Sequence, residues 1–381
     1  MNALLKRIVF ISPYAGSIVS FRGPLIKELI DLKAEVYVLA PDYSPEIRKA
    51  VEELGAKPVD YLLDRTGTNF LNDLKTLFQL SHIFIKLKPQ VIVPYNIKPI
   101  VYGLLAGAFT RVPTRVALIE GLGYAFIKNP SLKSHIINWI VRFSYKVSLA
   151  FAHYVFFLNP DDLNDFLRLH IVNPEKVRLL GGIGFLLDEW QPAPPVTQPV
   201  TFTLAARLLK EKGICEYAEA AKIIKRRYPR TRFILLGGLD TNPGALKREE
   251  VEKWVRDDIL EWYGNVPDVR PYFAQTSVYV LPSYYREGVP RSTQEAMAMG
   301  RPVITTDAPG CRETVIDGVN GFLIPPRDPE ALIKAMERFI LRPELIIQMG
   351  NESRKLVEER FDARKQNQKF LREIMMLYEN Q

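Results

Sequence analysis

The chain has 381 residues, a length that corresponds to two or three domains rather than one. Hydrophobic residues make up 47% of the chain and charged residues 25%, which is typical of a folded globular protein and excludes a largely disordered one. The two cysteines, Cys215 and Cys311, are too few for a disulfide framework or a cysteine metal site, and they favour a reducing compartment.

The N-terminal region is predicted to be a first strand rather than a targeting signal. Residues 1–20 lack a long apolar core followed by a small-residue cleavage site. A membrane-spanning helix needs about 20 apolar residues in a row, and the nearest candidate, residues 135–158, is interrupted by Arg142 and Lys146. We therefore expect a cytoplasmic protein that does not span a membrane.

The formal net charge of +8 is concentrated in one part of the chain. Between Arg65 and Phe157 there are eleven bases but only two acids, Asp73 and Glu120, and aromatic residues are interleaved with the bases. Such a segment suits an anionic membrane surface. The helical pattern at 132–152 fits either a membrane contact or the core. No nucleic-acid partner is expected, because no recognisable motif accompanies the charge.

The first half alternates short β-branched runs with amphipathic helical patterns. Strands are expected at 7–12, 35–40, 58–62, 91–95, 115–119, 154–158 and 177–180, and helices at 21–33, 45–54, 71–87, 99–110, 132–152 and 161–169. Continuous apolar strands joined by helical crossovers predict a parallel sheet that is covered on both faces.

Residues 191–199 carry four prolines and are expected to form an interdomain linker. The alternation then restarts. Strands are expected at 200–205, 232–236, 260–263, 278–281, 303–306 and 321–324, and helices at 214–228, 246–256, 269–274, 292–299, 312–317 and 329–341, with a helical tail at 343–378.

These patterns predict an α/β protein with two doubly wound, Rossmann-like domains. The expected domains are 1–190 and 200–362, joined by the linker 191–199, and residues 363–381 are expected to form a helix that packs back on the first domain. Doubly wound domains bind ligands at the carboxyl ends of their strands, so the cleft between the two is the expected site.

One strand–loop–helix unit of the second domain carries two carboxylates. Glu287 lies in a Gly/Pro loop after the strand 278–281, and Glu295 lies inside the helix that follows. An ionised carboxylate only accepts hydrogen bonds and suits sugar and ribose hydroxyls, whereas loop amides and a helix N-terminus suit an anion. The unit therefore predicts a pocket for a ligand that is part polyol and part phosphate.

Other strand ends of the second domain fit the same ligand. Arg207 and Lys212 follow its first strand beside a helix N-terminus, where they could neutralise a departing diphosphate. Gly237 and Gly238 follow its second strand, and residues 306–313 follow a third. Taken alone, Arg207 and Lys212 could equally be ordinary surface residues.

The combined pattern resembles the retaining glycosyltransferases of family 4, which have the GT-B fold. The residues that carry the resemblance are Pro282-Ser-x-x-x-Glu287-Gly-x-Pro-x-x-x-x-Glu295-Ala-x-Ala-x-Gly-x-Pro-Val-Ile, Arg207 and Lys212 before a glycine, and Pro309-Gly310 through Glu313 followed by Asp317-Gly-Val-Asn-Gly-Phe-Leu. These matches cover most of residues 200–330.

The resemblance implies a donor site without a metal or other cofactor. Its expected members are Glu287 with the backbone of Gly288, Val289 and Pro290 on the sugar, Glu295 on the ribose, Arg207 and Lys212 on the leaving diphosphate, and Gly264 through Val266 beside the nucleobase, with Gly237 and Gly238 nearby. The chain also lacks the Asp-x-Asp of metal-dependent GT-A transferases and a His/Cys cluster for zinc.

The first domain is expected to hold the acceptor. An acceptor phosphate could sit where Gly16 and Ser17 follow the first strand and Arg22 opens a helix. Tyr95-Asn96-Ile-Lys98-Pro99 and Glu120-Gly121-Leu-Gly123-Tyr124-Ala-Phe126 follow later strands and resemble bacterial enzymes that extend polyprenyl-diphosphate-linked saccharides, including the type that adds N-acetylgalactosamine. Glu120 is expected to contact the acceptor hydroxyl, with a structural cap as the alternative.

We therefore expect a retaining hexosyltransferase of bacterial surface-polysaccharide or glycan assembly, peripheral at the inner face of the cell membrane. It would move a hexose or N-acetylhexosamine from a nucleotide-diphosphate sugar, such as UDP-GalNAc, to a polyprenyl-diphosphate-linked saccharide. Two alternatives stay open: a nucleotide-sugar epimerase on the same fold and a non-enzymatic nucleotide-sugar sensor. A dinucleotide oxidoreductase is not favoured, because no Gly-x-Gly-x-x-Gly stands at a strand-to-helix turn.

Overall fold

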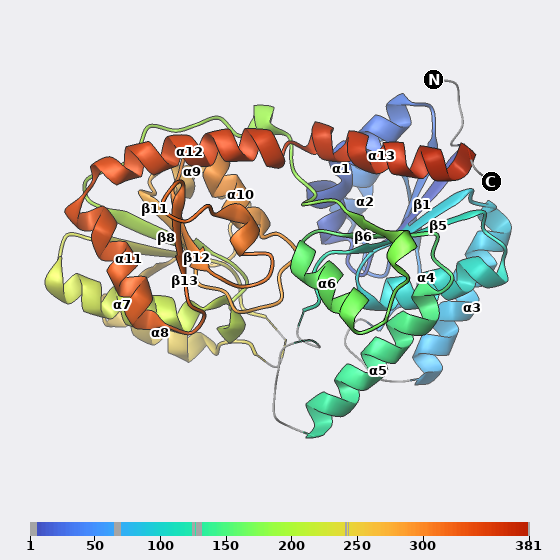
Figure 1. Cartoon of the computed structure of the whole chain (residues 1–381), viewed down its shortest axis with the longest axis horizontal. Coiled ribbons are helices and arrows are strands. Elements are labelled where there is room, and N and C mark those ends of the chain that lie inside the picture. The colour runs from blue at the N-terminus through green and yellow to red at the C-terminus, as the bar shows by residue number, and fades with distance from the viewer. Residues whose placement is uncertain are drawn as a thin grey trace. The chain divides into compact units, whose positions relative to one another are not determined.

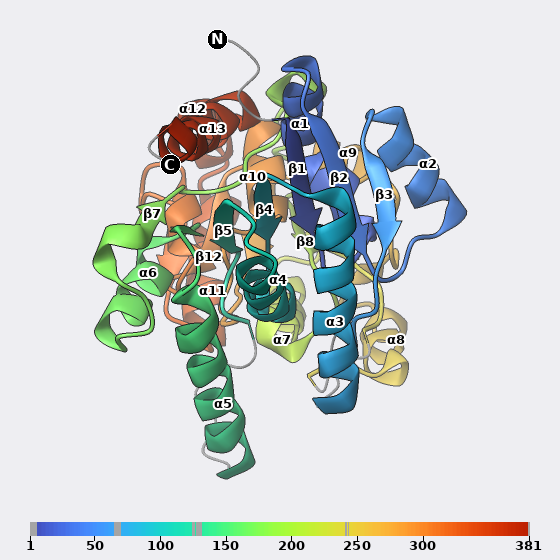
Figure 2. The ribbon, with the colours of Figure 1, turned by 90° about the vertical axis from the view of Figure 1, so that its right-hand side faces the viewer.

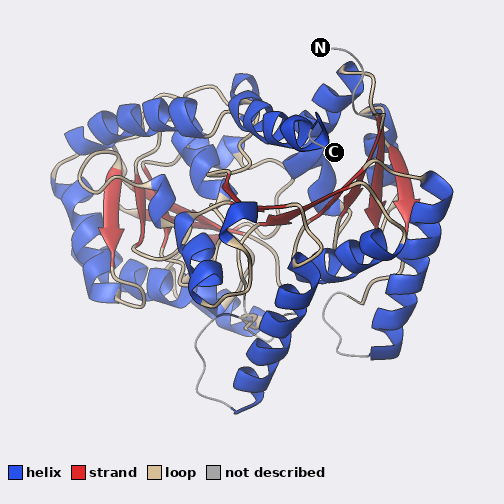
Figure 3. Ribbon diagram, turned by 45° about the vertical axis from the view of Figure 1, so that its right-hand side comes forward, coloured by secondary structure: helices blue, strands red, loops and turns tan. Residues whose placement is uncertain are grey.

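The computed structural model describes residues 6–64, 70–123, 126, 132–240, 242 and 244–379. The chain divides into two compact units, the first made of Met1–Phe185 with Ala363–Gln381 and the second of Leu186–Asp362. In each unit, helices cover both faces of a parallel sheet (Figures 1 and 3). The predicted α/β class with two Rossmann-like domains is confirmed.

The sheet of the first unit has seven strands in the order β3-β2-β1-β4-β5-β6-β7. The strands are β1 (Arg7–Ile11), β2 (Glu35–Ala40), β3 (Lys57–Asp60), β4 (Val91–Pro94), β5 (Thr114–Ile119), β6 (Tyr154–Phe157) and β7 (Val177–Leu179). Phe10 of β1 lies opposite Val38 of β2 on one side and Val93 of β4 on the other, and both pairings are parallel. The strand order reverses between β1 and β4, which is where doubly wound sheets bind ligands.

The helices of the first unit pack as two layers. They are α1 (Gly16–Asp31), α2 (Pro45–Glu53), α3 (Phe70–Leu87), α4 (Ile97–Phe109), α5 (Leu132–Leu149), α6 (Pro160–Arg168) and α13 (Ala363–Glu379). α4 packs against both α3 and α5, whereas α1 packs against α2 and α13. Figure 2 shows α4 between α3 and α5, with the outer ends of α3 and α5 extending past it.

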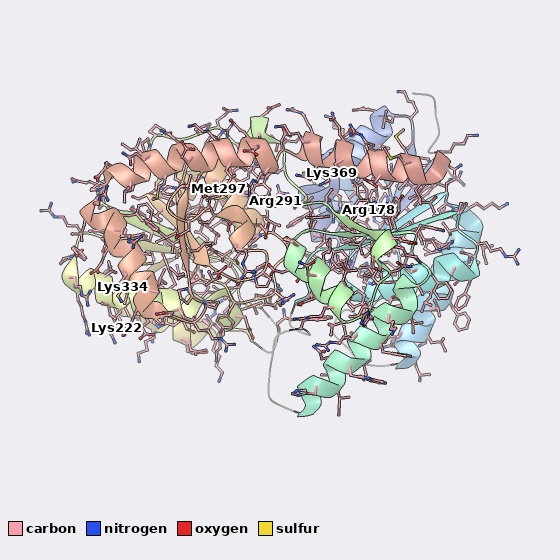
Figure 4. All side chains as sticks on the ribbon, in the orientation of Figure 1. Arg178, Lys222, Arg291, Met297, Lys334 and Lys369 are labelled. Carbon is pink, nitrogen blue, oxygen red and sulfur yellow. The ribbon has the colours of Figure 1, made fainter. Side chains whose placement is uncertain are left out.

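The C-terminal helix α13 belongs to the first unit. The ring of its Phe370 lies 4.8 Å from that of Phe156 in β6. Arg178 of β7 donates from Nε to Oε2 of Glu373 at 2.8 Å, and Nζ of Lys369 donates to the Leu180 carbonyl at 3.2 Å. Figure 4 labels Arg178 and Lys369 at this contact.

The sheet of the second unit has six strands in the order β10-β9-β8-β11-β12-β13, with the reversal between β8 and β11. The strands are β8 (Thr201–Ala205), β9 (Arg232–Leu236), β10 (Glu261–Trp262), β11 (Val278–Leu281), β12 (Val303–Thr306) and β13 (Gly321–Ile324). The helices are α7 (Ile214–Arg227), α8 (Arg248–Arg256), α9 (Arg270–Ala274), α10 (Arg291–Ala298), α11 (Pro329–Leu341) and α12 (Glu344–Arg360).

Several helices begin where a capping residue precedes a proline. The side chains of Ser44, Asn159 and Asp328 accept from the backbone N–H three residues on, at 3.3, 2.8 and 2.9 Å. A proline follows each of them at the first helical position, where its missing N–H costs nothing and its fixed φ suits a helix. The sequence therefore specifies the starts of α2, α6 and α11 directly.

Three predicted elements are wrong in extent. α1 begins at Gly16 rather than near residue 21. The Asp42 carboxylate accepts from the Ala15 N–H at 2.7 Å directly before the helix, and Pro24 lies inside it. The helix expected at 312–317 is one 3-10 turn, Arg312–Thr314. The tail is two helices, α12 and α13, because the chain passes from the second unit back to the first between them.

Residues 186–199 pack within the second unit. Trp190 is 9% exposed, and Arg301 donates to the carbonyls of Ala193 and Pro194 at 3.1 and 3.0 Å. The proline-rich segment that was expected to be a linker therefore packs against the second unit, directly before β8. Of the helices in the described parts of the chain, none is long and apolar enough to cross a membrane.

Candidate active site

A lysine and a glutamate meet at the carboxyl edge of the second sheet, where β8 and β11 are neighbours. Nζ of Lys212, in the loop after β8, lies 2.5 Å from Oε1 of Glu287, in the loop after β11, and the two side chains are only 13% and 10% exposed. Ser283 donates from Oγ to the same carboxylate oxygen at 2.9 Å. The Glu287 carboxylate is therefore fixed by an ammonium and a hydroxyl at the reversal point of the sheet.

Two glycines allow the surrounding loops to approach this pair. A Cβ on Gly213, whose φ is +75°, would lie 2.1 Å from the carbonyl oxygen of Pro282. A Cβ on Gly310, whose φ is +77°, would lie 2.3 Å from the Gly288 oxygen and 2.5 Å from the Glu287 oxygen. Only glycine fits these positions, so the loops after β8 and β12 pack directly against the Glu287 loop.

Arg207 has a carboxylate partner of its own. Its Nη1 lies 2.9 Å from Oδ2 of Asp240 in the loop after β9, and its side chain is 48% exposed. Burial disfavours the charged form of Asp240, but the Asn242 amide and the Arg207 guanidinium outweigh burial and lower the pKa of that carboxyl. Arg207 and Lys212, the two cations expected to bind the diphosphate, therefore each pair with a different carboxylate, Asp240 and Glu287 respectively.

Glu295 lies on α10, directly after the loop that carries Glu287, Gly288, Val289 and Pro290. Its Oε1 accepts from Nε of Arg291 at 2.7 Å, and its side chain is 15% exposed. Burial raises the pKa of Glu295, although Arg291 opposes the shift. Figure 4 labels Arg291 on α10. Pro290 directly precedes the helix, and Val289 is 9% exposed.

The glycines expected near the nucleobase join two adjacent loops. Gly237 donates from its N–H to the Gly264 carbonyl at 2.7 Å, and its own carbonyl accepts from Nε1 of Trp262 at 2.9 Å. Gly238 lies beside Asn265, and the half-buried Val266 follows in the same loop. Hydrogen bonds therefore join the loop after β9 to β10 and the loop after β10.

In the first unit, the structure brings three of the predicted acceptor residues together. Nη2 of Arg22 contacts Oε1 of Glu120, and Nδ2 of Asn96 donates to Oε2 of Glu120 at 3.2 Å. The Arg22 side chain is 2% exposed, and its guanidinium lies 4.6 Å from the centroid of the Tyr95 ring. Arg22 is thus a buried partner of Glu120 rather than a residue at the start of α1.

The remaining acceptor candidates lie at separate places. Gly16 and Ser17 form the first residues of α1, and Ser17 donates from Oγ to the Tyr14 carbonyl at 2.8 Å. Lys98 is bound to Asp73 at 2.8 Å and to the Asp64 carbonyl at 2.7 Å. Gly121 and Gly123 follow β5, and Tyr124 lies outside the described residues.

Sequence reasoning missed three residues that hold the site: Ser283, Asp240 and Arg291. The signal for Ser283 was available, because it is the serine of the Pro-Ser-x-x-x-Glu pattern itself. Arg291 stands four residues before Glu295, a spacing that favours a helical ion pair. Asp240 follows the Gly237-Gly238 turn, but nothing local links it to Arg207. In the described residues, no three His, Cys, Asp or Glu side chains are grouped so as to hold a metal ion.

Two doubly wound units, with the donor candidates in the second and the acceptor candidates in the first, define the GT-B fold. A family model described as "Glycosyl transferases group 1" matches residues 199–341. Among solved structures, sucrose-phosphate synthase from Thermosynechococcus elongatus superimposes with a TM-score of 0.80 at 20% identity, over 99% of this chain and 100% of that one.

Two curated relatives match most of the chain. The N,N'-diacetylbacillosaminyl-diphospho-undecaprenol alpha-1,3-N-acetylgalactosaminyltransferase of Campylobacter jejuni is 30% identical over 330 residues, which is 83% of this chain and 84% of the relative. The UDP-Gal:alpha-D-GlcNAc-diphosphoundecaprenol alpha-1,3-galactosyltransferase of Escherichia coli is 24% identical over 359 residues, 88% and 90% of the two chains. The chain belongs to the group 1 glycosyltransferases, which confirms the prediction that it is a glycosyltransferase of this family.

Proposed function

We propose that this glycosyltransferase moves a hexose or N-acetylhexosamine from a UDP-linked sugar to a polyprenyl-diphosphate-linked saccharide in surface-polysaccharide or glycan assembly. The printed names of both relatives support the acceptor class, since each acts on a diphospho-undecaprenol-linked sugar. The name of the E. coli relative includes a UDP-sugar, and that of the C. jejuni relative includes N-acetylgalactosamine, which makes UDP-GalNAc the first donor to test.

The Lys212–Glu287 pair at the reversal point of the second sheet carries this proposal. A carboxylate there can accept from sugar hydroxyls. An ammonium has three N–H donors, and only one of them is needed for Glu287, so Lys212 can also reach a phosphate oxygen. Fixed charges of this kind in a site of low exposure stabilise the charge that develops on a leaving diphosphate.

The reaction we propose retains the anomeric configuration and needs no metal. The bond between the anomeric carbon and the diphosphate oxygen breaks, and the acceptor oxygen attacks from the same face. The acceptor proton passes to the departing diphosphate oxygen, which Lys212 and Arg207 hold. Glu295, on α10, would accept from the ribose hydroxyls.

On the acceptor side, we assign Glu120 to the attacking hydroxyl. Its two oxygens contact Arg22 and Asn96, so the carboxylate has a fixed orientation at the carboxyl end of β5. Gly16 would offer its N–H, and Ser17 its hydroxyl, to the acceptor diphosphate at the start of α1, since the Ser17 N–H already donates to the Tyr14 carbonyl at 3.4 Å. Because a polyprenyl chain stays in the bilayer, we place the enzyme at the inner face of the cell membrane.

The test is turnover of UDP-GalNAc, UDP-Gal and UDP-GlcNAc with a polyprenyl-diphosphate saccharide, with and without EDTA, and with the product's anomeric configuration read by NMR. Lys212→Ala, Glu287→Ala and Glu295→Ala should each reduce turnover strongly. Arg178→Met, which removes an ion pair of similar length in the first unit, should not. Undiminished turnover in all three site variants would overturn the proposal, and an inverted product or a loss with EDTA would overturn the mechanism.

A further inference from the structure

Helix α5 exposes a stripe of large apolar side chains. The members are Ile136 (52% exposed), Trp139 (65%), Ile140 (50%), Phe143 (55%) and Val147 (39%). They recur every three or four residues and therefore lie on one face of the helix. The Trp139 and Phe143 rings stack with centroids 5.7 Å apart and planes at 9°. An exposed apolar patch of this extent marks a contact with something other than water.

Helix α3 carries a second stripe of the same kind. Its members are Leu71 (66% exposed), Leu74 (36%) and Phe78 (67%). α4 packs against both α3 and α5, and the outer ends of both helices extend past it in the same direction (Figures 1 and 2). We call these eight side chains of α3 and α5 the α3/α5 surface.

The charge around the α3/α5 surface identifies its partner. From Phe70 to Phe151 the sequence has two acids, Asp73 and Glu120, and each faces a base, Lys98 and Arg22 respectively. Two exposed bases adjoin the apolar stripes: Lys75 follows Leu74 on α3, and Lys146 precedes Val147 on α5. Apolar side chains flanked by bases, with no unpaired acid among the described residues between them, are complementary to an anionic bilayer, whose lipid headgroups attract the bases and whose acyl region takes up the apolar groups.

We propose that the outer ends of α3 and α5 insert the α3/α5 surface into the interfacial region of an anionic membrane. This inference rests on the proposed lipid-linked acceptor and explains how the enzyme reaches it. α5 follows β5, so its first turns lie at the carboxyl edge of the sheet, the same edge that holds Glu120. Insertion there brings the acceptor residues to the bilayer surface, where the diphosphate of a polyprenyl carrier lies.

Binding to vesicles tests the surface directly. Vesicles of phosphatidylglycerol and phosphatidylethanolamine should sediment the protein, with weaker but persistent binding at high salt because insertion is not screened, and phosphatidylcholine vesicles should sediment less. Ile140→Ser with Phe143→Ser, and Leu71→Ser with Phe78→Ser, should each lower vesicle binding by about tenfold or more. Leu341→Ser, which replaces an equally exposed leucine (66%) of α11, is the matched control and should bind normally.

Trp139 reports insertion by itself. Brominated phospholipids should quench the tryptophan emission of the bound protein, and Trp139→Phe should remove most of that quenching while vesicle binding persists. Unchanged binding by both double variants, or no quenching of the bound wild type, would overturn the proposal. The proposal would also be overturned if the wild type self-associated without lipid and the double variants did not, because the α3/α5 surface would then bind a second copy of this chain.

Activity assays separate this inference from the proposed function. The double variants should turn over a short-chain, water-soluble acceptor like the wild type, which also shows that they are folded, and they should lose turnover of a long-chain acceptor embedded in vesicles. If the wild type binds vesicles but uses neither acceptor, the proposed acceptor is wrong, whereas the proposal that the α3/α5 surface binds membranes is still supported. Equal turnover of the embedded acceptor by wild type and variants would overturn the role of the surface.

Discussion

Nζ of Lys212 and Oε1 of Glu287 are 2.5 Å apart, although the two residues are 75 positions apart in the chain. The contact forms because β8 and β11 are neighbours and their following loops share the reversal point of the sheet. Both side chains are largely withdrawn from water, with exposed fractions of 13% and 10%, so the two charges face each other in a site of low exposure. A donor that enters this site meets a preorganised pair rather than two independent groups.

The first prediction concerns this pair as a unit. Lys212→Met and Glu287→Gln should each lower kcat/KM by roughly 100-fold or more, the size of effect seen when one preorganised charge or donor is removed from a transition-state site. The double variant should lose little more than the worse single variant, because groups that act together are not additive. Steady-state kinetics of all three against wild type measure this, and multiplicative losses would contradict a shared role.

The second prediction uses the buried pair in the first unit. Arg22→Met leaves Glu120 without its cation and should lower the free energy of unfolding by about 3 kcal/mol. Arg22→Met with Glu120→Gln should recover much of that loss, because no uncompensated charge remains. Arg22→Lys tests the stacking on Tyr95 separately, since lysine keeps the charge without the planar group. Chemical denaturation gives the values, and a double variant as unstable as the sum of both single variants would refute the pairing.

The third prediction follows from the pKa of Glu295. Burial raises it above its ordinary value of 4.5, so at pH values just above 4.5 the folded state keeps a proton that the unfolded state has lost. Stability contributed by this group must then fall as pH rises from 4.5 to the raised pKa, and stay level above it. Glu295→Gln should gain stability relative to wild type across that interval. Urea unfolding at several pH values measures the difference.

Arg291 provides the control for that experiment. It opposes the shift of Glu295, so Arg291→Met should move the pKa of Glu295 further up and widen the pH interval. The same change in a Glu295→Gln background should have no such effect on the pH profile. A pH dependence that is identical in wild type and Glu295→Gln would show that Glu295 titrates at its ordinary value.

The strands of this protein could be predicted almost residue by residue. β2, β9, β11, β12 and β13 coincide with the ranges expected from the sequence, because a strand buried on both faces is a continuous apolar run with clear ends. The contacts that build the site could not be derived in this way. Arg22 and Glu120 are 98 residues apart, and no local periodicity in the sequence indicates that two such distant residues pair.

Helix α5 shows a second limit of sequence reasoning. Its pattern fitted either core or membrane contact, and the structure shows that one end of the helix is buried and the other is exposed. Tyr145 and Leu149, near its end, are 1% exposed, whereas Trp139 and Phe143 nearer its start are more than half exposed. The first turns of α5 extend past α4, the helix that packs against it (Figure 2). Which residues of α5 are covered depends on where α4 lies, and the periodicity of the α5 sequence does not contain that information.

The last prediction compares two glycines that have nearly the same backbone. Gly310 and Gly318 have φ of +77° and +75°, but a Cβ on Gly310 would collide with the Gly288 and Glu287 carbonyls, whereas a Cβ on Gly318 meets nothing within 4 Å. Gly318→Ala should therefore cost only the left-handed strain of about 1 kcal/mol, with kcat/KM unchanged. Gly310→Ala must also displace the loop that holds Glu287, so it should cost more stability and lower kcat/KM by roughly tenfold or more, since misplacement of about 1 Å can cost 100-fold. Steady-state kinetics and chemical unfolding of both variants measure the two losses. Equal losses of activity would show that the Gly310 loop does not position Glu287.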